Sequence, residues 1–158
     1  MRVRKIVREP KLLTSDTNWR TDDMQPRYSW IFQRTKPIRA GWKWRSVIAT
    51  DSANREYLFL TQCNPERDEW KAWLILRASS SESSLVSRLE YHGTHPGLHV
   101  HVDCQRGGLE QGPASIDRLA RIPLVAKHHR RKHTWREQSF WEQARRHFRI
   151  EHPRGPLL

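Results

Sequence analysis

Four of the nine histidines of this chain lie within ten residues, from His92 to His101. Histidine is the side chain whose unperturbed pKa lies nearest to neutrality, so it can donate a proton, accept one or bind a metal ion. Two acidic residues, Glu90 and Asp103, flank the same segment. This combination predicts a chemical site. The four histidines are His92, His95, His99 and His101.

A turn is predicted in the middle of this segment. Pro96-Gly97 suits the two central positions of a type II turn, because proline presets φ and glycine tolerates a positive φ. On either side, residues 85–92 and 98–104 alternate between apolar and polar side chains, as half-buried strands do. We therefore expect a hairpin whose two strands bring the histidines together.

The predicted turn fixes the register of the hairpin by counting. Side chains alternate along a strand, so opposite residues share one face of the sheet, and an even shift of the pairing would keep them there. A carboxylate opposite a carboxylate is unfavourable, so a metal ion, a shared proton or an arginine such as Arg88 should offset it. The expected opposite pairs are His92 with His101, Thr94 with His99, and Glu90 with Asp103.

One chemistry open to this hairpin is cleavage of RNA without a metal ion. A histidine base would activate the 2′-hydroxyl, and a second histidine would protonate the leaving oxygen. We assign these roles to His92 and His101, with His99 beside them and with Asp103 or Glu90 orienting an imidazole. The positive charge of the chain favours this route, because cationic side chains stabilise the charged phosphorane.

The other chemistry is metal-assisted hydrolysis, for which His99, His101 and Asp103 are candidate ligands. This stretch resembles the signature of metallo-β-lactamase-fold hydrolases, although Cys104 stands where those enzymes carry a histidine and the chain is too short for that fold. No cofactor is assigned; a divalent ion such as Zn or Mn would suit these ligands. A zinc ion could instead stabilise a non-catalytic interaction domain.

The charge of the chain favours a polyanionic partner. The formal net charge is +12. The first fifty residues carry a net charge of +8, residues 51–100 carry −2, and the remainder carries +6. Basic ends around a near-neutral middle suit nucleic acid, with RNA favoured over DNA; an acidic protein partner or a larger complex is the alternative. Phosphate contacts are predicted for Lys127, Arg130, Arg131, Lys132, Arg145, Arg146 and Arg149.

Composition narrows the cellular setting. Two cysteines do not make a disulfide framework, so a reducing, cytoplasmic environment is expected. No signal peptide is expected, because no apolar run follows the basic N-terminus. No stretch approaches the length of a transmembrane helix, so no membrane partner is expected.

The elements that must position the hairpin predict an α+β fold. We expect an antiparallel meander of five or six strands, then a short helix at 116–121 and a long amphipathic helix from a Thr134 cap to about Arg149. Residues 1–27 are expected to form a partly irregular arm, 28–152 a single domain and 153–158 a tail. The predicted strands are 28–35, 42–50, 56–63, 70–77, 85–92 and 98–104.

The function that best joins these features is that of a small basic protein acting on nucleic acid, with histidine-dependent ribonuclease activity. In size, charge and expected architecture the chain resembles small basic ribonuclease toxins of bacteria, which implies a toxin or phage-defence role. The alternative is a non-catalytic nucleic-acid-binding or interaction subunit of a larger complex, and whether the chain is an enzyme stays open at this point.

Overall fold

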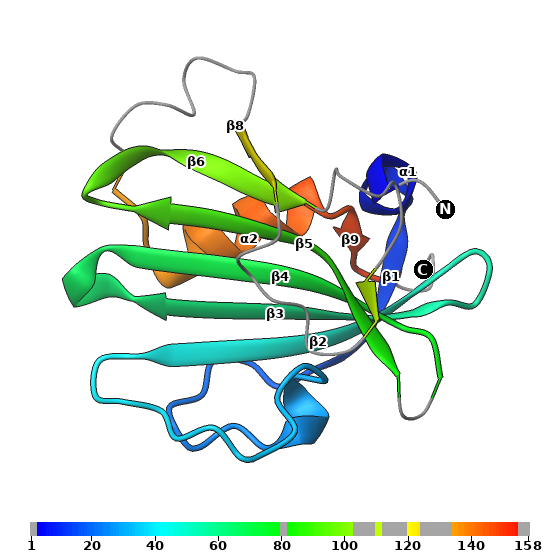
Figure 1. Ribbon diagram of the computed structural model, residues 1–158, viewed down its shortest axis with the longest axis horizontal. Coiled ribbons are helices and arrows are strands. Elements are labelled where there is room, and N and C mark those ends of the chain that lie inside the picture. Colours follow the sequence, from blue (N-terminus) through cyan, green and yellow to red (C-terminus); the bar gives the residue numbers. More distant parts are fainter. Residues whose placement is uncertain (1–2, 80–81, 103–109, 112–119, 124–133, 155–158) are drawn as a thin grey trace.

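The computed structural model describes residues 3–79, 82–102, 110–111, 120–123 and 134–154 (Figure 1). Within these residues, nine strands form one curled sheet, and helix α2 lies behind it in Figure 1. The α+β class predicted from the sequence is confirmed. Among the same residues, no helix has the length and apolar character that a membrane span needs.

The sheet follows the order of the chain over most of its width, with neighbours β8-β6-β5-β4-β3-β2-β1-β9, and β7 pairs with β5. Strands β1 to β6 are consecutive antiparallel neighbours, whereas β9 joins β1 in parallel. The helices are α1 (Val3–Arg8) and α2 (Glu137–His147), with short 3-10 turns η1 (Pro26–Tyr28) and η2 (Pro65–Arg67). The strands are β1 (Lys11–Asp16), β2 (Lys43–Asp51), β3 (Glu56–Asn64), β4 (Glu69–Arg77), β5 (Ser83–His92), β6 (His95–Val102), β7 (Glu110–Gln111), β8 (Ala120–Pro123) and β9 (Ile150–Glu151).

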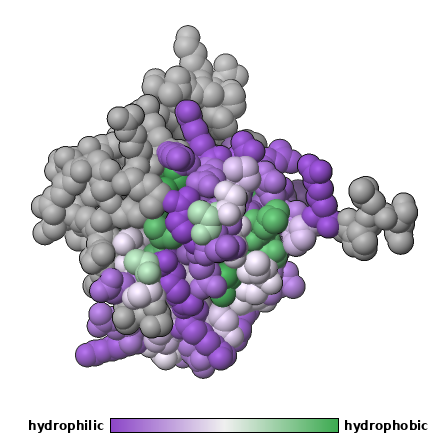
Figure 2. Space-filling view, turned by 90° about the vertical axis from the view of Figure 1, so that its right-hand side faces the viewer, coloured by the Kyte–Doolittle hydropathy of each residue, from purple (hydrophilic) through white to green (hydrophobic). Residues whose placement is uncertain are grey.

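Both faces of the central strands are buried, which explains why β3 and β4 are apolar on both sides. On the first face, Tyr57 and Phe59 pack with Phe140 and Trp141 of α2. On the second face, Leu58 and other apolar side chains form a separate cluster away from α2. Of the large hydrophobic side chains described, Leu12 is the exposed one, and the side of the molecule in Figure 2 is mostly hydrophilic.

The segment 17–42, here called the covering segment, closes the second face next to β2 (Figure 1). The strand predicted at 28–35 is wrong, because this stretch forms η1 and irregular backbone. Its aromatic side chains pack on the sheet, and its backbone pairs by isolated bridges, Arg20 with Trp44 and Met24 with Lys36. Aromatic residues that are typical of a strand therefore serve here as a cover over apolar surface.

The N-terminal residues, expected to form an arm, contribute α1 and a paired strand, β1. Lys11 joins the two chain ends, because its buried Nζ donates hydrogen bonds to the carbonyls of Ile6, Glu9 and Phe148, at 2.6, 2.7 and 3.1 Å. The charged sequence of the segment does not reveal the long-range contact with Phe148 or the position of β1 between β2 and β9.

Two helix predictions also need correction. The helix predicted at 116–121 is wrong at its end, because Ala120 and Arg121 belong to β8; residues 116–119 lie outside the described residues. Helix α2 is shorter than predicted, with Arg136 as its N-cap, and it ends at His147. Arg149 then adopts a left-handed backbone, φ 56°, which turns the chain into β9.

Acid should weaken a contact between β1 and β2. The carboxylate of Asp16 accepts hydrogen bonds from Nε and Nη2 of Arg45, at 3.0 and 2.6 Å, and from the amide of Asn18. Burial alone would raise the pKa of Asp16, but these hydrogen bonds together hold it below its ordinary value. The group therefore stabilises the fold above its ordinary pKa, and this contribution is lost as the pH falls through the lower folded pKa.

We expect Asp16→Asn to lower the free energy of unfolding by about 2 kcal/mol at pH 6, as for a hydrogen-bonded charge. The difference from wild type should shrink at pH 3, which urea denaturation at both pH values would measure. Glu66→Gln, at an exposed acid, is the control and should change little. Equal losses at both pH values would contradict the assigned role of the Asp16 charge.

Candidate functional site

The histidine hairpin is formed by β5 and β6, and its turn is Gly93-Thr94. The predicted turn at Pro96-Gly97 is wrong, because both residues belong to β6. The amide of Gly93 donates a hydrogen bond to the carbonyl of Asp68, at 3.0 Å, and a Cβ at Gly93 would lie 2.6 Å from Asp68 Oδ2. The close approach of this neighbouring turn explains why glycine is needed at that position.

Moving the turn changes which residues lie opposite one another. His92 pairs with His95, Glu90 with His99, and Arg88 with His101. The predicted pairs are therefore wrong. The sum of the two residue numbers in each pair nevertheless differs from the predicted sum by an even number, so these residues still share one face of the sheet. The partner of His99 is two positions from His92 along β5 and the partner of His101 is four positions away, with an irregular register between Glu90 and His92. Along β5, the partner of His99 is therefore nearer to His92 than the partner of His101 is.

Glu90 lies at the centre of this hairpin. Its Oε1 is 3.0 Å from Nε of Arg88, and its Oε2 is 3.5 Å from Nε2 of His92. The side chains of Arg88 and Glu90 are 8% and 6% exposed, whereas that of His92 is 27% exposed. A buried, charge-compensated carboxylate can thus fix the orientation of a solvent-accessible imidazole. The contact between Glu90 and Arg88 agrees with the expectation that an arginine such as Arg88 would offset the charge of Glu90.

The other predicted residues of the hairpin and of the basic block are described in part. For His95, His99 and His101 the structure describes the backbone and not the side chain. In the part of the chain that is described, no group of three histidine, cysteine or acidic side chains could hold a metal ion. Asp103, Lys127, Arg130, Arg131 and Lys132 lie outside the described residues.

The predicted arginines of the C-terminal helix lie on a different part of the molecule. Helix α2 packs on the first face of the sheet, opposite to the face that carries Glu90. Arg145 binds Glu142 and the carbonyl of Ile150, and Arg149 lies 3.4 Å from a carboxylate oxygen of Glu151. Arg146 is exposed. These side chains therefore do not join the histidine hairpin in one surface.

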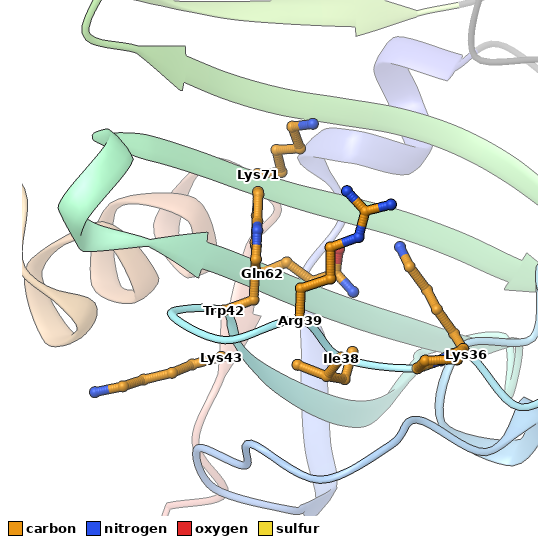
Figure 3. Close-up of a pocket in the computed structure, with 8 residues that line it drawn as sticks. Lys36, Ile38, Arg39, Trp42, Lys43, Gln62 and Lys71 are labelled. Carbon is orange, nitrogen blue, oxygen red and sulfur yellow. The ribbon is translucent and has the colours of Figure 1, made fainter.

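A cationic cavity at the edge of the covering segment was not predicted from the sequence. Its volume is about 410 Å³, within the range of small-ligand sites. Figure 3 shows the side chains of Lys36, Arg39 and Lys71 extending from the covering segment and from β4 around it. Burial, and then the charge of Lys71, lower the pKa of Lys36. The lining residues are Lys36, Pro37, Ile38, Arg39, Trp42, Lys43, Gln62 and Lys71.

The cavity and the hairpin are connected by one row of residues across the sheet. Gln62 of β3 pairs with Lys71 of β4, Lys71 pairs with Glu90 of β5, and Glu90 pairs with His99 of β6. Cross-strand neighbours have Cβ atoms about 5 Å apart. The cavity-lining Lys71 and the residues of the histidine hairpin therefore occupy adjoining strands. Sequence reasoning missed this row, because its members come from four separate segments.

Comparisons of the chain with protein-family models, with curated proteins and with solved structures found no match.

Proposed function

We propose that the protein cleaves RNA, using His92 and His99 as the acid–base pair and Glu90 as the residue that positions His92. The observation that carries this proposal is the row in which Lys71, Glu90 and His99 occupy paired positions on three neighbouring strands. His92, whose Nε2 is 3.5 Å from Oε2 of Glu90, is the second histidine of the proposed pair.

Charge supports a nucleic acid as the substrate. The net charge of +12 favours a polyanion, and Lys71 belongs to a cavity with three further cations, Lys36, Arg39 and Lys43. The reaction needs the same combination of groups, because a phosphodiester must be held by cations while protons move at two of its oxygens.

The proposed reaction needs no oxidant, reductant or co-reactant. One imidazole accepts the proton of the 2′-hydroxyl as its oxygen forms a bond to phosphorus. The second imidazole donates a proton to the 5′-oxygen as its bond to phosphorus breaks. Lys71 compensates the charge that develops on the phosphorane. The products are a 2′,3′-cyclic phosphate and a 5′-hydroxyl.

The test of this proposal is the cleavage of RNA by the purified protein in the presence of EDTA. We expect single-stranded RNA to be cut to products with cyclic phosphate ends, and a 2′-deoxy oligonucleotide of the same sequence to remain intact. Cleavage of both polymers, or cleavage that needs added Zn or Mn, would contradict the metal-free mechanism and favour a metal-bound hydroxide. Absence of cleavage under every condition would overturn the enzymatic proposal.

A non-catalytic nucleic-acid-binding role is the second candidate. The observation that favours it is the cationic cavity, which could bind phosphate groups without any histidine. Binding without cleavage, with a steep dependence on salt concentration, would identify this function.

A further inference from the structure

We propose that the cavity between the covering segment and β3–β4 binds a single nucleotide unit, with its phosphate among the cations and its base against Trp42. The unit is either a free mononucleotide or the phosphorylated end of a strand. This inference deepens the proposed function and rests on it for the class of ligand.

The charge of the cavity calls for an anion. Lys36, Arg39 and Lys71 line it together, and none of the three forms a salt bridge with a carboxylate among the described residues. Neighbouring cations repel one another, so an anion that entered would relieve the repulsion among the three. Lysine and arginine are the usual side chains for binding phosphate.

The cavity also has the features that would bind a base. Trp42 lines it and is partly exposed, and Nζ of Lys71 lies 5.8 Å from the centre of its ring. A phosphate held by Lys71 would therefore bring the remainder of a nucleotide close to the indole. Stacking of a base on an aromatic side chain is a common and sequence-tolerant contact.

Gln62 adds a neutral hydrogen-bonding group to the cavity. It is 6% exposed and lines the cavity. In Figure 3 it lies among the cavity residues, between Arg39 and Trp42. The amide is not among the buried polar atoms that lack a hydrogen-bond partner, and an amide can both donate to and accept from the edge of a base or a sugar hydroxyl.

Isothermal titration with AMP, adenosine and inorganic phosphate tests this inference without any cleavage step. We expect AMP to bind with one site per chain. Arg39→Gln and Lys71→Gln should each weaken AMP and phosphate binding about tenfold or more, as expected for a charge-assisted hydrogen bond. Trp42→Leu should weaken AMP about fivefold or more and leave inorganic phosphate unchanged.

The matched control is Arg34→Gln, which removes the same charge from an exposed position of the covering segment outside the cavity. Equal losses for Arg34→Gln and Arg39→Gln, or no binding of AMP, would overturn the inference. If AMP binds no more tightly than inorganic phosphate, and Trp42→Leu does not alter phosphate binding, the proposed contact between the base and Trp42 is overturned. Circular dichroism of each variant would exclude a loss of folding.

Two oligonucleotides separate the sources of the nucleotide. A short RNA with a 5′-phosphate that displaces AMP more effectively than the same RNA with a 5′-hydroxyl would identify a strand end. If neither RNA displaces AMP, the ligand is a free mononucleotide. Either result supports the proposal that the cavity binds a nucleotide. A protein that cleaves RNA but does not bind AMP contradicts this inference alone, whereas one that binds AMP but never cleaves contradicts the catalytic proposal.

Discussion

Replacement of His99 by alanine is expected to reduce RNA cleavage by a factor of about 100 or more, because general acid–base catalysis contributes about 10² to 10⁴. His92→Ala should have an effect of the same size. RNA binding should change by less than about threefold, since the cavity cations remain. Initial rates with a fluorescent RNA, together with binding to a non-cleavable 2′-deoxy analogue, would measure both quantities.

His101→Ala is the matched control for this pair. His101 lies on the same strand two residues further on, opposite Arg88 and distant from His92 along β5. We expect it to retain cleavage within about tenfold of wild type. A complete loss in His101→Ala with normal cleavage in His99→Ala would reverse the assignment of the acid–base pair.

The largest loss of stability is expected for Asp51→Ala, at the turn between β2 and β3. The carboxylate of Asp51 is fully buried and accepts hydrogen bonds from the amides of Ala53 and Arg55, from Arg55 Nε and from the hydroxyl of Tyr57. Its removal leaves a cation and several donors without their acceptor, so the free energy of unfolding should fall by about 3 to 5 kcal/mol. Urea denaturation at neutral pH would measure it.

Ser52→Ala, one residue further along the same turn and exposed, is the control, with an expected change within about 0.5 kcal/mol. A loss of less than about 1 kcal/mol for Asp51→Ala would contradict the view that this carboxylate organises the turn. The variant should also weaken the contact of α1 with the sheet, because Arg55 binds both Asp51 and Glu9.

The site was predictable in part because alternation along a strand is a local property. The spacing of Glu90, His92, His99 and His101 already placed them on one face of the sheet. An error in the position of the turn leaves them on that face as long as it shifts the strand register by an even number of residues. Which histidine lies next to which carboxylate was not predictable. It depends on Gly93 lying against Asp68, a contact between two turns that are distant in the sequence.

By itself, the sequence determined the period-two strands from 43 to 102, the class of the fold and the cluster of imidazoles, because each follows from the order of neighbouring residues. Tertiary structure alone decided the remainder. The covering segment is irregular because its aromatic side chains find an apolar sheet face to bury, and β1 is paired because Lys11 meets carbonyls from both chain ends. The cationic cavity exists because two parts of the chain meet. Lys36 and Arg39 of the covering segment lie near Lys71 of β4 where that segment crosses β3 and β4. Such juxtapositions depend on long-range packing, which local periodicity does not encode.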